Sequence, residues 1–192
     1  MQRVILGIDP GSRVTGYSIL TEDNGSLRAI RCDVLRMAKM DDHSDRLQYI
    51  FEHIGNIIRS FKPTECAIET PVYGRDPQAM LKLGRAQAAC ILAATSNNVP
   101  VIEYYPKAVK KSITGNGNAS KKQVAFMLRK MVTLEEEKLP NDATDALAVA
   151  WCHMVKQNAI DSGVPASQKK HHQNRKSSSW AEFIKNNPDR IR

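Results

Sequence analysis

The 192-residue chain is long enough for one α/β domain with an appendage and too short for two catalytic lobes. Its apolar stretches stay below the roughly 18 uncharged residues needed to cross a bilayer, and its N-terminal sequence lacks a signal-peptide pattern. We therefore expect a cytoplasmic protein without membrane association. A net charge of +8 suits a polyanionic partner without identifying it. The four cysteines are far apart, which argues against a CxxC zinc site and predicts reduced thiols.

The first third of the chain predicts an antiparallel meander followed by a helix. Residues 3–8 form an apolar run that ends at Asp9-Pro10-Gly11, where proline and glycine stop a strand. Residues 14–20 and 27–35 are β-like stretches separated by a turn sequence. Apolar residues at helical spacing then predict an amphipathic helix over 45–61, whose apolar face should cover a sheet.

The rest of the core alternates strands and helices. We predict, in chain order, a strand at 66–69, a helix at 78–97, a strand at 101–104, a short helix from Pro106, a helix after the capping-box sequence at Ser120, and a last helix from Asn141 or Asp142 to Lys156. A three-strand antiparallel start followed by this alternation is the layout of the ribonuclease H-like fold. We therefore expect an α/β protein with a mixed five-stranded sheet and helices on both faces.

The end of the chain has the composition of a tail. Residues 156–192 carry eight Lys or Arg against three Asp or Glu, and the stretch 168–179 is too polar to bury a core. We predict one folded domain over 1–156 and a basic, largely flexible tail over 157–192. A capping-box sequence favours a short helix at 179–187, which either docks on a partner or has no function.

Four carboxylates are predicted to meet at one edge of the sheet. Asp9 ends the first strand and Glu69 the fourth, so both emerge at the same edge if these strands are parallel neighbours. Asp142 and Asp145 lie three residues apart on a helix, about 60° apart around its axis, and can enter the same site. A set of carboxylates without His or Cys suits Mg²⁺ or Mn²⁺, and paired ions of this kind promote in-line attack on a phosphodiester. The spacing therefore favours a nuclease.

Each of these residues also has an ordinary structural interpretation. An Asp before Pro-Gly commonly forms a turn, and Asp142 taken alone is more often a helix N-cap. Asp145 would suit a solvated helix face, and Glu69 would suit an ion pair with a nearby base. The nuclease interpretation therefore depends on all four residues meeting in one place.

Segments along the chain resemble the RuvC-type Holliday junction resolvases, the crossover junction endodeoxyribonucleases, in order and in spacing. They are GIDPGSRVTGYSIL (7–20), AIE (67–69), LKLGRAQAA (81–89), EYYPKAVKKSITGNGNASKKQV (103–124) and DATDALAVAWCH (142–153). The resemblance covers residues 3–155 and is specific, because a GIDPG strand end, a strand-end Glu and a DxxDAL helix must coincide.

The resemblance implies an activity, a metal and partners. It implies that Asp9, Glu69, Asp142 and Asp145 are catalytic and bind a pair of Mg²⁺ ions, with Mn²⁺ able to substitute. It further implies a homodimer that makes paired symmetric nicks across a four-way DNA junction in recombination and repair. The branch-migration proteins RuvA and RuvB are implied partners.

Basic residues fit the same resemblance. Lys110 and Lys121 match lysines that the family places near the scissile phosphate or the DNA backbone. We expect Lys121 to take part in catalysis by balancing charge on the phosphate, and Lys122 to contact the DNA backbone in a salt-dependent way. Without the family, each would be an ordinary surface lysine.

The chain departs from the family in the loop after Glu69. The family usually carries an aromatic residue three positions after its catalytic Glu, where it stacks on an unpaired base; that position is Val72 here, with Tyr73 beside it. We expect Tyr73 to supply the stacking and Arg75 to contact phosphate. The substitution leaves the carboxylates intact but puts the details of junction opening and sequence choice in doubt.

Two other functions share parts of this pattern. Kinases and ATPases of the actin and sugar-kinase fold also open with a GID strand and a glycine turn, but they bind ATP between two lobes, for which this chain is too short. A junction-binding or RNA-binding module of the YqgF-like kind would share the fold. Four acids facing nucleic acid without a metal would repel it, which argues against such a module.

Overall fold

The computed structural model describes residues 2–72, 74, 76–135 and 138–163. The chain separates into two units, Met1–Asn158 and Ala159–Arg192, and the fold described below is that of the first. Within the described residues, the helices are too short or too polar to span a bilayer. The helix predicted at 179–187 and the DNA contacts predicted for Tyr73 and Arg75 lie outside the described residues.

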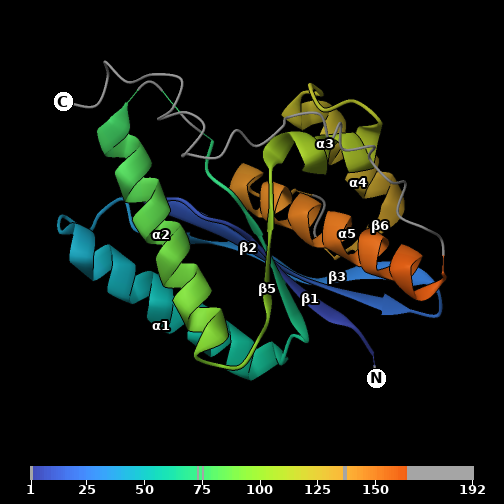
Figure 1. Cartoon of the computed structure of the whole chain (residues 1–192), viewed down its shortest axis with the longest axis horizontal. Coiled ribbons are helices and arrows are strands. Elements are labelled where there is room, and N and C mark those ends of the chain that lie inside the picture. Colours follow the sequence, from blue (N-terminus) through green and yellow to red (C-terminus); the bar gives the residue numbers. More distant parts are fainter. Residues whose placement is uncertain (1, 73, 75, 136–137, 164–192) are drawn as a thin grey trace, which may run out of the picture. The chain divides into compact units, whose positions relative to one another are not determined.

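A mixed six-stranded sheet forms the centre of the domain (Figure 1). Its strands are β1 (Val4–Asp9), β2 (Val14–Asp23), β3 (Ser26–Arg36), β4 (Glu65–Glu69), β5 (Val101–Tyr104) and β6 (Val132–Leu134), in the spatial order β5-β4-β1-β2-β3-β6. The first three strands form the predicted antiparallel meander, while β4 pairs in parallel with β1 and β5 in parallel with β4. The predicted fold class is confirmed, but the sheet has six strands rather than the expected five.

β6 is the strand that the sequence analysis did not predict. It is three residues long and pairs in parallel with the start of β3. It begins directly after a helix that ends at Met131, where neither Gly nor Pro marks a boundary. A strand this short cannot display the alternation by which strands are recognised.

Helices cover both faces of the sheet (Figure 1). The helices α1 (His43–Phe61) and α2 (Pro77–Thr95) lie on one face, and α3 (Pro106–Thr114), α4 (Lys121–Met131) and α5 (Asn141–Asp161) lie on the other. Strand alternation divides the core accordingly: Leu6 and Ile8 pack with α1 and α2, whereas Ile5 packs with the opposite layer. By the same alternation, Asp9 lies on the α5 side of the sheet.

Local sequence fixes where several helices begin. The Asp42 side chain caps α1 by accepting a hydrogen bond from the Ser44 amide at 2.6 Å, and α2 and α3 each open with proline, whose missing amide proton is harmless at that position. The predicted capping box is present at α4, where Ser120 and Gln123 exchange hydrogen bonds. One boundary differs clearly, because α5 ends at Asp161 rather than near Lys156.

Glycines in β1 and β2 let α5 lie close to the sheet. A Cβ placed on Gly7 would lie 2.8 Å from the Cβ of Ala150, and one on Gly16 would lie 2.9 Å from the amide nitrogen of Ala143, distances that real Cβ atoms essentially never show. Gly16 is the β2 residue opposite Asp9. The absence of side chains therefore brings the first turn of α5 down beside the end of β1.

Candidate active site

Two acidic residues end neighbouring strands at the same edge of the sheet. β1 and β4 pair in parallel with Ile8 opposite Ile68, so Asp9 and Glu69 are the next residues of their strands. Both side chains are partly buried, and strand alternation turns both toward the α5 layer. The structure therefore meets the condition on which the predicted acidic site depended, that the two strands are parallel neighbours.

The first turns of α5 add two aspartates to this edge. One carboxylate oxygen from each of Asp9, Asp142 and Asp145 lies within 4.8 Å of the others. Asp142 is the second residue of α5 and lies inside its first turn, so it is not the N-cap. Glu69 lines a pocket of about 160 Å³ together with Asp9 and Asp145. The four predicted carboxylates are therefore neighbours.

Two lysines border the same pocket. Lys110 of α3 and Lys121 of α4 both line it. The Nζ of Lys121 donates a hydrogen bond to Oδ2 of Asp145. The Lys121 side chain is 65% exposed and that of Asp145 is 17% exposed, so the ammonium group reaches from solvent into the acidic cluster.

Burial and mutual repulsion make these carboxylates hold protons more tightly than usual. Burial, followed by the charge of Asp145, raises the pKa of Asp9 to about 7, although Lys121 opposes the shift. Burial, followed by the charges of Asp9 and Asp145, raises the pKa of Glu69 to about 8, again against nearby lysines. For Lys121, burial lowers the pKa, but the hydrogen bond and charge of Asp145 outweigh burial and raise it.

The donor set of this pocket fits a hard divalent cation. The acidic residues offer only carboxylate oxygens, and neither His nor Cys lines the pocket in the described part of the chain. A bound cation would offset the repulsion that contributes to both raised pKa values.

Sequence comparison identifies the family. The family model of the Crossover junction endodeoxyribonuclease RuvC matches residues 5–153. RuvC of Salinibacter ruber is 45% identical over 188 residues, which cover 98% of each chain. RuvC of Cytophaga hutchinsonii is 42% identical over 192 residues, 100% of this chain and 90% of that one. The chain belongs to the RuvC family.

Solved structures agree with this membership in the RuvC family. The structure of Thermus thermophilus RuvC in complex with Holliday junction substrate matches with a TM-score of 0.76 and 29% identity, over 84% of this chain and 97% of that chain. The yeast mitochondrial Holliday junction resolvase Ydc2 matches with a TM-score of 0.65 over 83% of this chain and 81% of that chain; at 15% identity it supports the fold alone. The chain is therefore a crossover junction endodeoxyribonuclease by family, which argues against the kinase and ATPase alternative.

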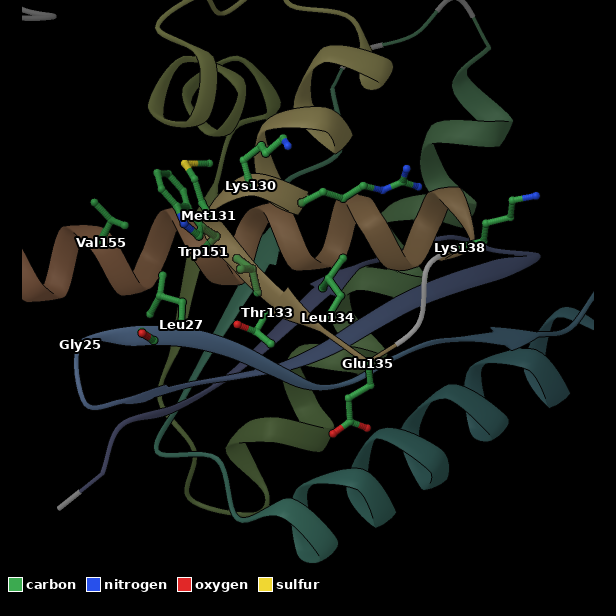
Figure 2. A pocket seen from close by; sticks show the side chains of 13 residues that line it. Gly25, Leu27, Lys130, Met131, Thr133, Leu134, Glu135, Lys138, Trp151 and Val155 are labelled. Carbon is green, nitrogen blue, oxygen red and sulfur yellow. The ribbon is translucent and has the colours of Figure 1, made fainter.

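A groove of this RuvC domain, shown in Figure 2, is lined by none of the four carboxylates. It measures about 1060 Å³ and is lined by the β2–β3 turn, the end of α4, β6, and residues of α5 that include Trp151 and Val155. Leu27, at its wall, belongs to the start of β3, level with the start of β1, whereas Asp9 ends β1. The larger of these two cavities is therefore not the one that the carboxylates line.

Other residues surround the carboxylate pocket of this RuvC domain. Lys122, which is predicted to contact the DNA backbone, lines a neighbouring pocket on α4. Gly7 and Gly16, which allow α5 to bring its aspartates to Asp9, were not predicted as site residues from the sequence. A glycine inside a strand is a signal of close backbone approach, and both glycines lie within the GIDPGSRVTGYSIL segment.

Proposed function

We propose that Asp9, Glu69, Asp142 and Asp145 hold Mg²⁺ and that the enzyme uses this site to resolve four-way DNA junctions by paired symmetric hydrolysis. The convergence of three aspartates within 4.8 Å, beside Glu69 in one pocket, is the observation that carries the proposal. Mn²⁺, which takes the same oxygen ligands, is expected to substitute.

Each group of the pocket has a part in this proposal. When bound, the ions supply Lewis-acid activation of water and stabilisation of the leaving oxygen. The four carboxylates would hold these ions with oxygen ligands alone. Lys121, already at the cluster through Asp145, balances negative charge on the phosphate, and Lys110 contributes from the α3 side.

A homodimer would give such an enzyme its paired cuts, because a two-fold assembly presents two sites to a two-fold substrate. The outer face of α2 supports a dimer contact. Leu81 and Leu92 are 55% and 58% exposed there, and the small residues Gly84 and Ala88 are exposed between them along the helix. Ala86, Ala89, Ala93 and Ala94 of the same helix are buried against the core instead.

The remaining contacts of the proposed function concern DNA and other proteins. Tyr73 is proposed to stack on an unpaired base, and Arg75 and Lys122 to contact phosphates. RuvA and RuvB are proposed partners, with the segment 179–187 as a candidate docking helix in the basic stretch that follows α5. We expect the enzyme to act in the cytoplasm, where bacterial chromosomal DNA resides.

Cleavage of an immobile synthetic four-way junction tests the proposal. Wild-type protein and Asp9→Asn would be compared on the junction, on linear duplex and on an RNA–DNA hybrid, with Mg²⁺ or with EDTA. Paired symmetric nicks confined to the junction, lost with Asp9→Asn and with EDTA, are the expected result. Tight junction binding without cleavage in any metal would instead favour a YqgF-like binding module, and cutting confined to the hybrid would indicate a different substrate.

A further inference from the structure

A second pocket adjoins the catalytic pocket across α4. It measures about 380 Å³ and is lined by the end of α3, the loop that follows, and the outer flank of α4. Lys121 lines the catalytic pocket, and its neighbour Lys122 lines this one. Both lysines are exposed at the first turn of α4, where helix amides also favour phosphate. A DNA strand that crosses this turn can therefore reach both pockets.

The wall of this second pocket is an aromatic ring that the core does not use. Val124 and Leu128 bury the inner face of α4, whereas Phe126 is 62% exposed on its outer flank. The Nζ of Lys130 lies 6.0 Å from the centre of the Phe126 ring. An exposed ring beside exposed lysines has the composition of a stacking platform for a base, with cations for the adjoining phosphates.

Amide groups at the rim of the pocket could read the edge of a base. The Gln123 side-chain oxygen accepts a hydrogen bond from the Ser120 amide at 2.8 Å, and the Asn116 side-chain oxygen accepts one from the Asn118 amide at 2.9 Å. Within the described part of the chain, the side-chain nitrogens of Gln123 and Asn116 donate no hydrogen bond. Each NH₂ group is thus a donor suited to the acceptor atoms on base edges.

We propose that this second pocket takes an unpaired nucleobase of the strand that is cut, stacked on Phe126 with its neighbouring phosphate at Lys122. The inference rests on the proposed junction cleavage and adds a determinant of where the cut falls. Lys121 and Phe126 are five residues apart, about 7.5 Å along the helix axis, which corresponds to roughly two nucleotide steps of 3.4 Å. The base would therefore lie within about two nucleotides of the scissile phosphate.

Substitutions of Phe126 test the proposed base pocket. Phe126→Ala, Phe126→Trp and Phe126→Leu would be compared on junctions that carry each of the four bases at positions within two nucleotides of the cut. Junction affinity and cleavage rate would be measured, together with the fluorescence of 2-aminopurine at those positions, which is quenched by stacking. Phe51→Ala is the matched control, because Phe51 is also an exposed phenylalanine, 40% exposed, but lies on α1 across the sheet.

The expected pattern separates stacking from a general surface effect. Phe126→Ala and Phe126→Leu should lower affinity or cleavage roughly 5- to 100-fold, flatten the base preference and lose the quenching. Phe126→Trp should retain all three properties, and Phe51→Ala should match wild type. Wild-type behaviour of Phe126→Ala, or full function of Phe126→Leu, would overturn the proposed base pocket. If a protein segment occupied the pocket instead of a base, the purified variants would cut junctions at the wild-type rate, and the proposal would also be overturned. If the proposed junction cleavage itself were wrong, wild-type protein would cut no junction, and this result distinguishes the two failures.

Discussion

The substitution Gly16→Ala tests whether the close approach of α5 to β2 sets the geometry of the acidic cluster. Its Cβ would overlap the carbonyl oxygen of Asp142 and lie 2.9 Å from the amide nitrogen of Ala143, where ordinary contacts measure 3.4–4 Å. Because both obstructing groups are backbone, the first turn of α5 must move by on the order of 1 Å. Asp142 and Asp145 would move with it, while Asp9 stays on β1.

The expected losses differ for stability and for activity. Overpacking of this kind costs about 1–3 kcal/mol, and each kcal/mol lowers the melting temperature of a domain of this size by about 2–4 °C. A misplacement of about 1 Å in a catalytic constellation costs roughly 100-fold in rate. We therefore expect Gly16→Ala to fold with a modestly lower melting temperature, to need more Mg²⁺ for half-maximal cleavage, and to cut junctions about 100-fold more slowly.

The control must lose stability without moving α5. Ile54 is fully buried on α1, across the sheet, and Ile54→Val should cost about 0.5–1.5 kcal/mol while leaving the cluster in place. Thermal unfolding and single-turnover junction cleavage, both as a function of Mg²⁺ concentration, would be measured for the two variants. Gly16→Ala with wild-type cleavage and wild-type Mg²⁺ dependence would refute the reasoning, as would an equal loss of activity in Ile54→Val.

Four further predictions follow from the site and the fold. Mg²⁺ should raise the melting temperature of wild type at pH 8, and Asp145→Asn should reduce that rise; an equal rise in both would place the ion elsewhere. Burial lowers the pKa of His153, so the unfolded chain takes up a proton that the folded protein resists, and the free energy of unfolding falls as pH drops below about 6.5. In urea titrations between pH 7 and 5.5, His153→Gln should lose less of this free energy than wild type. An equal loss in both proteins would contradict the prediction. Leu92→Glu should give a monomer by light scattering that makes single rather than paired nicks, and a stable dimer would exclude the α2 contact. Tyr73→Ala should weaken cleavage more than Val72→Ala, and the reverse order would show that Val72 holds the stacking position.

Much of the site could be predicted because its residues lie at element boundaries that the sequence marks. Pro10-Gly11 ends the first strand at Asp9, and the capping box at Ser120 places Lys121 in the first turn of a helix. The spacing of Asp142 and Asp145 gives them a common helix face whatever the helix packs against. These are local properties, and the structure agrees with each of them.

The sequence left open which elements meet, because pairing between distant segments depends on the sum of many contacts. Parallel pairing of β1 with β4 sets Asp9 beside Glu69, and only the assembled sheet decides it. The edge strand β6 escaped prediction for the same reason, since its three residues become a strand only by pairing with β3.

Sequence by itself therefore indicated the fold class and the candidate carboxylates, because turn signals, helix caps and residue spacing act over short stretches of chain. It indicated the family through segments that resemble RuvC. Tertiary structure alone decided how close those carboxylates come and what surrounds them. The approach of α5 depends on glycines that look unremarkable until a helix backbone lies against them. The raised pKa values of Asp9 and Glu69 arise from burial and from charges brought by other elements, which no single segment contains.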